Sequence, residues 1–168
     1  MTAVVSFVVM MAIMLGELVL SRVHETALRK RGATEPSGDV YRQLAWVYPA
    51  TFVAMASEGA VTGPAPGAIA VVGLLVLVAA KALKAWAISS LGERWTYRVL
   101  VLPNTPLVTR GPYAWARHPN YLAVFGEIIG FALLVGALVA GAVSLVALAV
   151  LVRKRIAVEE RALGRGGV

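Results

Sequence analysis

Two groups of polar and ionisable residues flank the longest apolar stretch of this chain. Arg117-His118-Pro119-Asn120-Tyr121 directly precedes the stretch, and Arg155 with Glu159 and Glu160 directly follows it. Guanidinium, imidazole and carboxylate groups hold charged ligands through strong hydrogen bonds. Two such groups at the two ends of one membrane segment suggest a site where the membrane meets water.

The composition is that of an integral membrane protein. The chain has 168 residues, of which 59% are hydrophobic and only 15% are charged, and its mean hydropathy is +0.77. These values lie outside the range of soluble domains. The net charge of +7 does not indicate nucleic-acid binding, because the basic residues flank apolar segments. Cysteine is absent, which excludes thiolate chemistry. We expect a single domain over residues 1–168.

Four apolar stretches predict the membrane helices. About 20 apolar residues cross a bilayer, so residues 3–20, 43–61 and 67–88 each predict one span. The fourth stretch, 121–152, is too long for one ordinary span. A hairpin that turns between Gly136 and Gly141 is the alternative to a single tilted helix.

The placement of basic residues favours the hairpin. Arginines and lysines lie between the first two spans, between residues 89 and 120, and after residue 152, whereas 62–67 contains none. With five spans and an outer N-terminus, every basic cluster falls on the cytoplasmic side, as the positive-inside rule requires. We therefore predict an all-α protein of five transmembrane helices in a bacterial cytoplasmic membrane.

A few charged and small residues lie inside or beside these predicted spans. Lys81 and Lys84 are interpreted as snorkelling to the interface, with phosphate or substrate contact as the alternative. Glu127 fits either a functional role or a hydrogen-bonded packing role. Gly126 and Gly130 form a GxxxG pair, which predicts a helix contact within the chain rather than a dimer. His24 is interpreted as a solvated or capping residue.

The segment from Ser89 to Asn120 differs from the spans. It holds four aromatic residues and four prolines. Aromatic rings favour the membrane interface, and the prolines disfavour a regular helix over 103–119. We predict an ordered cytoplasmic loop, so that residues 1–88 supply three spans and residues 89–168 form the catalytic half.

Ordered motifs in the second half resemble the isoprenylcysteine carboxyl methyltransferase family. They are Leu91-Gly92-Glu93-Arg94-Trp95-Thr96, Leu107-Val108-Thr109-Arg110-Gly111-Pro112-Tyr113, Arg117-His118-Pro119-Asn120-Tyr121, and Arg155 with Glu159-Glu160 after the apolar hairpin. The resemblance covers residues 91–161. It implies a membrane-embedded transferase that uses S-adenosylmethionine, and the glycine-rich Rossmann fingerprint is absent from the sequence. No metal is expected.

The resemblance also implies the site residues. Cofactor contacts are carried over to Arg98, Thr105, Pro106, Leu107, Val108, Tyr113, His118, Pro119, Asn120, Tyr121 and Glu159. Arg155, one helical turn before Glu159, would orient the acceptor, and Glu160 is a further catalytic candidate. The sequence departs from the family pattern at Pro106 and at Arg98, where a cofactor-contacting glutamine is expected.

The expected acceptor is a carboxylate or hydroxyl on a lipophilic or lipid-linked molecule. A carboxylate is already ionised near neutral pH, whereas a phenol would need a base such as Glu160 or Glu127. The alternatives are methylation of a phospholipid amine or lipid phenol, an NADPH-dependent membrane reductase, and a non-enzymatic membrane scaffold. We expect a monomer surrounded by membrane lipids, with the active site facing the cytoplasm and no nucleic-acid partner.

Overall fold

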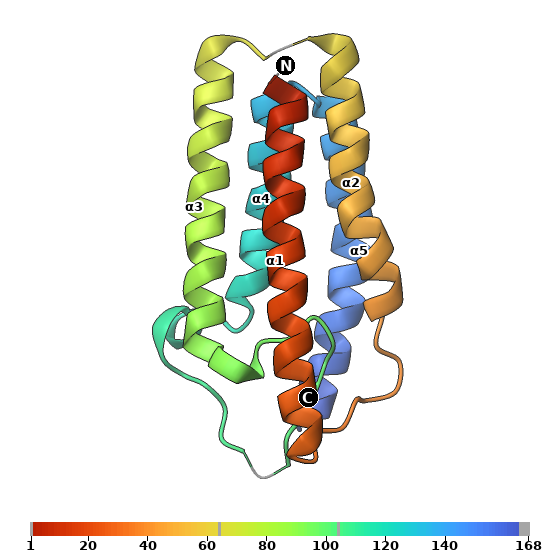
Figure 1. Cartoon of the computed structure of the whole chain (residues 1–168), viewed down its shortest axis with the longest axis vertical. Coiled ribbons are helices and arrows are strands. Elements are labelled where there is room, and N and C mark those ends of the chain that lie inside the picture. Colours follow the sequence, from red (N-terminus) through yellow and green to blue (C-terminus); the bar gives the residue numbers. More distant parts are fainter. Residues whose placement is uncertain (1, 64, 104, 165–168) are drawn as a thin grey trace.

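Five long helices run side by side in the computed structural model, which describes residues 2–63, 65–103 and 105–164 (Figure 1). The helices are α1 (Thr2–Lys30), α2 (Tyr41–Thr62), α3 (Gly67–Leu91), α4 (Pro119–Val135) and α5 (Leu138–Ala162). Two short 3₁₀ turns, η1 (Gly92–Arg94) and η2 (Gly111–Ala114), interrupt the segment between α3 and α4. The described residues thus confirm the predicted all-α fold and the absence of a regular α-helix over most of 103–119.

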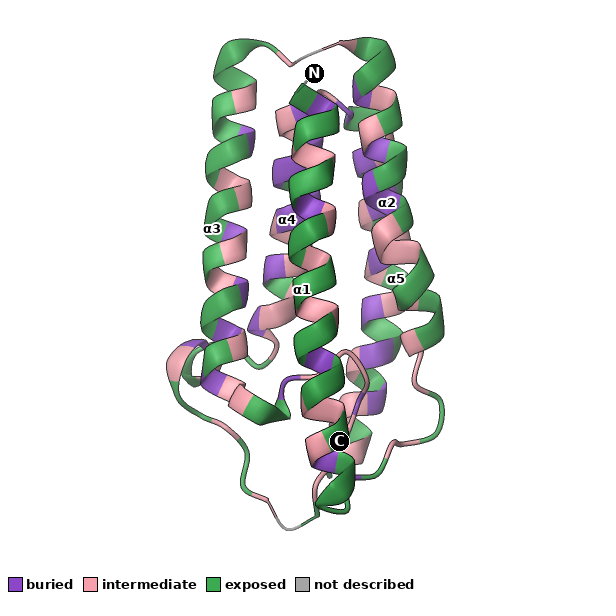
Figure 2. Ribbon diagram, in the orientation of Figure 1, coloured by how far each residue is buried: buried purple, intermediate pink, exposed green. Residues whose placement is uncertain are grey.

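Apolar side chains cover much of the outer surface. The helices Thr2–Lys30 and Gly67–Arg94 are long and apolar enough to cross a membrane, yet only 11% and 17% of their most apolar windows are buried inside the protein. Figure 2 shows exposed residues along the outer faces of α1, α2 and α3. A core helix of a soluble protein would be mostly buried, so these faces are suited to lipid.

The long apolar stretch folds as a hairpin. α4 ends at Val135, and Gly136 follows in the left-handed conformation with φ of 76°, where a glycine avoids the strain of a Cβ atom. α5 then begins at Leu138. The predicted turn near Gly136 is therefore confirmed, and Gly141 lies within α5, where it packs closely against Ala132.

The hairpin returns α5 to the end of the bundle from which α4 starts. This end also holds the segments 31–40 and 92–118, at the bottom of Figure 1, and is called the loop end below. Among the described residues, the arginines and lysines lie toward the loop end, apart from Lys81 and Lys84 within α3. The chain order thus brings the two polar groups flanking the hairpin to one end.

Glycines allow α3 and α4 to pack with their backbones in contact. A Cβ atom on Gly130 would lie 2.5 Å from the backbone nitrogen of Leu77, and one on Gly73 would lie 2.4 Å from that of Leu134. A Cβ atom on Gly126 would lie 2.9 Å from the Cβ atom of Ala80. The predicted GxxxG contact within the chain is confirmed, with α3 as its partner.

Replacing Gly130 with alanine should separate these two helices. Because the added methyl would meet the backbone of α3 rather than a flexible side chain, we expect a loss of about 1–3 kcal/mol in the free energy of unfolding. Thermal unfolding in detergent, followed by circular dichroism, measures this. Gly16→Ala is the matched control, since nothing lies within 4 Å of its added Cβ. Equal melting temperatures of the two variants would contradict the close backbone contact.

Four charged side chains form a closed group inside the bundle, which we call the ion ring: Glu17, Lys81, Lys84 and Glu127. Lys81 Nζ lies 3.1 Å from Glu17 and 3.0 Å from Glu127. Lys84 Nζ lies 2.6 Å from Glu17 and 3.4 Å from Glu127. The lysines therefore point inward, and their interpretation as snorkelling residues is wrong. Intramembrane charges are tolerated when they pair with one another.

Two tyrosine hydroxyls complete the ion ring. Tyr48 of α2 donates to Oε2 of Glu127, and Tyr97 donates to Glu17 over 3.0 Å. The other oxygen of Glu127 makes ionic contacts with the two lysines but no aligned hydrogen bond. The ring thus joins α1, α2, α3, α4 and the segment that carries Tyr97, and it gives Glu127 the packing role that the sequence left open.

One face of α1 holds the segment that follows η1. Ser21 Oγ accepts the backbone N–H of Tyr97 over 2.8 Å. His24 Nδ1 lies 2.8 Å from the carbonyl oxygen of Trp95, so this nitrogen donates the hydrogen bond. The interpretation of His24 as solvated or capping is therefore wrong, because a partner 71 positions along the chain fixes its ring.

Candidate active site

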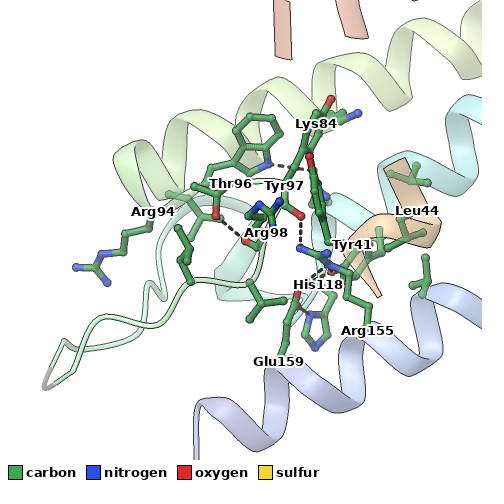
Figure 3. Close-up of a pocket in the computed structure, with 18 of the residues that line it drawn as sticks. Tyr41, Leu44, Lys84, Arg94, Thr96, Tyr97, Arg98, His118, Arg155 and Glu159 are labelled. Carbon is green, nitrogen blue, oxygen red and sulfur yellow. Dashed lines mark hydrogen bonds and ion pairs between the residues drawn. The ribbon is translucent and has the colours of Figure 1, made fainter. Parts of the chain in front are cut away.

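A cavity of about 770 Å³ opens at the loop end. Its walls come from all five helices, from the segment 94–108 and from η2. Sites for small molecules and cofactors commonly have volumes of about 300–1,000 Å³. Figure 3 shows the side chains of Arg155, Glu159 and His118 gathered on one side of it, with Lys84 on the opposite side.

The segment that follows Trp95 is tied to the loop between α1 and α2. Thr34 and Val101 exchange two backbone hydrogen bonds of 3.0 and 2.9 Å. Arg98 donates to Glu35 over 2.8 Å, and its guanidinium carbon lies 4.2 Å from the centre of the Tyr41 ring. Arg98 lines the cavity, but its charge is already engaged by Glu35.

The start of α4 keeps one backbone donor, the N–H of Asn120, because Pro119 has no N–H and those of Tyr121 and Leu122 donate to the carbonyl oxygen of His118. His118 occupies the N-cap position and makes no capping hydrogen bond with its side chain, and Pro119 opens the helix. Proline suits the first turn because its missing N–H is not needed there. Asn120 accepts a 3.4 Å hydrogen bond from the indole of Trp95. The first turn of α4 can therefore offer the N–H of Asn120 and the positive end of the helix dipole to an anionic part of a ligand.

Arg155 is the centre of the polar network. Its Nε donates to the hydroxyl of Tyr121 over 2.7 Å and to Glu159 over 3.2 Å. Its terminal nitrogens donate to Asp39 over 3.1 Å and to the carbonyl oxygen of Tyr97 over 2.5 Å. Figure 3 shows Arg155 beside Tyr97 and Glu159. A guanidinium has five N–H donors, so these contacts leave one donor on each terminal nitrogen for an acceptor.

Asp39 and Tyr97 are site residues that the sequence analysis missed. Asp39 follows a turn in the first loop, and it lies 116 positions from Arg155 in the chain. Tyr97 was recognised only as an interfacial aromatic residue, whereas its carbonyl group is what contacts Arg155. Neither contact leaves a signal in local spacing, because both depend on how distant segments pack.

His118 lies between two carboxylates. Its Nδ1 is 3.4 Å from Glu159 and its Nε2 is 3.4 Å from Glu160. Glu159 also accepts the hydroxyl hydrogen of Tyr121, and Glu160 lies 3.6 Å from Arg117. The hydrogen bond with Glu159 raises the pKa of His118 above 6.5, and the smaller effect of burial opposes it.

The stability of the protein should therefore depend on pH through His118. A histidine whose pKa is raised by folding contributes stability that is fully present below about pH 6.5 and is lost as the pH rises through the folded-state value. We expect the difference in melting temperature between the wild type and His118→Asn to shrink as the pH increases from 6 to 9. A constant difference over this range would show that folding does not change the pKa of His118.

The structure brings most of the predicted site residues to one cavity. Those that line it are Arg98, Thr105, Pro106, Leu107, Val108, Tyr113, His118, Asn120, Tyr121, Arg155 and Glu159. Pro119 and Glu160 are not among the lining residues. Pro119 is buried at the start of α4, and Glu160 lies 3.4 Å from Nε2 of His118. The cofactor roles of all these residues stay predictions.

The cavity has an apolar extension between α1 and α2. Met11, Met14, Leu15 and Leu18 line it from α1, and Leu44, Ala45, Trp46 and Pro49 line it from α2. Leu15 and Trp46 are 61% and 79% exposed on the outer surface, so the extension reaches that surface between the two helices. One cavity thus joins a polar end at Arg155 to an apolar opening.

These features define an all-helical membrane protein with a partly apolar site at one end of the bundle. The profile of the isoprenylcysteine carboxyl methyltransferase family matches residues 71–165. The chain belongs to this family, which implies a methyltransferase.

Two curated relatives span nearly the whole chain. YpbQ of Bacillus subtilis (strain 168) is 31% identical over 147 residues, covering 88% of each chain. A protein of Haemophilus influenzae is 28% identical over 160 residues, covering 95% of this chain and 93% of its own length. Both are described as uncharacterized proteins, so neither indicates an acceptor.

Proposed function

We propose that this protein transfers a methyl group from S-adenosylmethionine to a carboxylate or hydroxyl oxygen of a lipophilic acceptor. The observation that carries the proposal is the form of the cavity, which joins a polar end bearing Arg155 and Glu159 to an apolar extension lined by α1 and α2. A water-soluble cofactor and a lipophilic acceptor could thus meet in one space from two directions. Membership of the family supports the reaction type.

The polar end of the cavity fits the cofactor. When bound, S-adenosylmethionine supplies an electrophilic methyl group on a positively charged sulfur. Glu159 offers a carboxylate to that charge, and the rings of Tyr113 and Tyr121 offer aromatic faces. Backbone groups of residues 105–108 would hold the adenine. The N–H of Asn120 and the positive end of the α4 dipole suit the carboxylate of the methionine part.

Arg155 would set the direction of the acceptor. The two N–H donors that its protein partners leave free, one on each terminal nitrogen, can hold one or two oxygens. In-line displacement at a methyl group depends mainly on orientation and on exclusion of water. The surrounding network fixes the guanidinium, so that orientation is already set before an acceptor arrives.

We further propose that all five helices cross the membrane with the loop end in the cytoplasm. The gathering of basic side chains at the loop end supports this orientation. Because the chain has no native cysteine, single cysteines can report topology. Val139→Cys should react with an impermeant maleimide on intact cells, whereas Glu93→Cys should react only after lysis. The reverse pattern would invert the orientation.

Calorimetric titration of the protein in detergent tests the cofactor. We expect binding of S-adenosylmethionine and S-adenosylhomocysteine and no binding of NADPH. Binding of neither sulfur compound would overturn the methyltransferase proposal, and binding of NADPH alone would support a reductase.

Tritium transfer from methyl-labelled S-adenosylmethionine tests the acceptor class. The panel contains S-farnesylcysteine with a free carboxylate, a 4-alkylphenol and phosphatidylethanolamine. We expect labelling of one of the first two. Labelling of phosphatidylethanolamine alone would replace oxygen methylation with methylation of a phospholipid amine. Glycerol-backbone lipids without an amine serve as the blank.

A further inference from the structure

We propose that Asp39 is a positioning residue for the reaction, because it holds Arg155 and the segment beside the cofactor region with one carboxylate. The inference rests on the proposed function, since it concerns how Arg155 is presented to the acceptor. Asp39 lies in the loop between α1 and α2, outside the residues 71–165 that match the family profile. Asp39 does not line the cavity; the lining residues nearest to it in the sequence are Leu28 and Tyr41.

The two oxygens of Asp39 have different partners. Oδ1 accepts from Nη1 of Arg155 over 3.1 Å, and Oδ2 accepts the backbone N–H of Val99 over 3.1 Å. The side chain of Asp39 is only 4% exposed and that of Arg155 only 6%. A buried carboxylate with both oxygens occupied by donors is fixed in orientation. Its partners on both sides are therefore fixed with it.

Asp39 contacts Arg155 from outside the cavity. Arg155 lines the cavity, whereas Asp39 is absent from the lining residues. A free arginine side chain has many accessible rotamers, so an unheld guanidinium would sample many directions. The ion pair with Asp39, together with the carbonyl group of Tyr97, directs the remaining donors of Arg155 without using the space that an acceptor needs.

The same loop is attached to the cofactor side of the cavity. Besides the contact of Asp39 with Val99, Thr34 pairs with Val101 through two backbone hydrogen bonds. The segment that continues from Val101 leads to residues 105–108, which line the cavity. Asp39 thus fixes the guanidinium relative to that segment. Small displacements matter here, because a misplacement of about 1 Å can reduce turnover about 100-fold.

Replacing Asp39 with asparagine tests the proposal. The amide has the same shape but one acceptor oxygen and no charge, so it can satisfy only one of the two partners. We expect kcat for the best acceptor among S-farnesylcysteine and the 4-alkylphenol to fall about 10- to 100-fold. The affinity for S-adenosylhomocysteine should stay nearly unchanged, because the amide oxygen can still accept the N–H of Val99 and the two hydrogen bonds between Thr34 and Val101 remain. Asp39→Glu, which restores the charge on a longer side chain, should recover part of the lost turnover.

Glu93→Gln is the matched control. Glu93 pairs with Arg31 of the same loop over 3.1 Å, but both side chains are more than half exposed. An exposed pair of this kind contributes little, so this variant should keep the kcat of the wild type.

The outcomes separate this inference from the proposed function. A wild type that binds no S-adenosylhomocysteine and methylates neither acceptor overturns both. If the wild type methylates, an Asp39→Asn variant with unchanged kcat overturns the role of Asp39 alone. An equal loss of kcat and of S-adenosylhomocysteine affinity also overturns it, because a general disruption of the fold would then explain both losses. Loss of kcat with retained affinity, partly recovered by Asp39→Glu, supports it.

Discussion

Glu127→Ala should be among the most destabilising single substitutions in this protein, with a loss of about 3–5 kcal/mol in the free energy of unfolding. The carboxylate of Glu127 is fully buried, and it is one of two that face Lys81 and Lys84. Its removal leaves two ammonium groups with Glu17 as their shared carboxylate. The hydroxyl of Tyr48 also loses its partner. Thermal unfolding in detergent, followed by size-exclusion chromatography, measures the loss.

A charge-balanced double variant is the informative comparison. Lys81→Met combined with Glu127→Leu removes one positive and one negative charge, so the remaining pair of Glu17 and Lys84 is neutral. Replacing a complete buried pair by apolar residues often has little cost, whereas removing one partner is costly. We expect the double variant to be more stable than Glu127→Ala. If the single variant melts at the wild-type temperature, the ion ring contributes nothing to stability.

Arg155→Lys should reduce kcat about 100-fold while leaving the affinity for S-adenosylhomocysteine within a few fold. Lysine keeps the positive charge between Asp39 and Glu159, but it lacks the planar fork of donors that contacts Tyr121, Asp39 and the Tyr97 carbonyl together. An Arg-to-Lys exchange at such a site is not conservative. The acceptor would therefore lose its fixed direction even though the charge is retained.

Calorimetry and tritium transfer measure the two parts of this prediction separately. Lysine is preferred to alanine because removing the charge would leave the buried carboxylate of Asp39 without its ion pair and would destabilise the fold. Lys154→Met, one position earlier and more exposed, is the control for a change on the same helix. A wild-type kcat for Arg155→Lys would remove Arg155 from the proposed role, and equal loss of S-adenosylhomocysteine affinity would place it with the cofactor instead.

The sequence was sufficient to predict the features that depend on local pattern. The length of the apolar run and the distribution of basic residues predicted the hairpin, and Gly136 is the residue that allows its turn. The fourth apolar stretch was predicted to begin at residue 121, directly after the polar group that contains His118, and α4 begins at Pro119. Because the hairpin returns α5 to the loop end, these two predictions together also predicted that His118 and Glu159 lie close to each other, as they do.

The sequence was insufficient to predict ion pairs between residues that lie far apart in the chain. Lys81 and Lys84 would reach the interface if they faced lipid, but the rotation of α3 directs them toward Glu17 and Glu127. A hydropathy pattern does not fix that rotation, because α3 is apolar on most of its surface. Asp39 was missed for a related reason, since its ion pair exists only once the first loop folds over the end of α5.

The opening between α1 and α2 has a consequence for how the reaction would be measured. An acceptor that reaches the cavity through this opening is dissolved in the apolar phase around the helices and not in water. Its effective concentration is then a mole fraction in detergent or lipid. Adding inert lipid would dilute the acceptor and slow the reaction even when its amount per volume of buffer stays the same, and the methylated product would be released into the same two-dimensional phase.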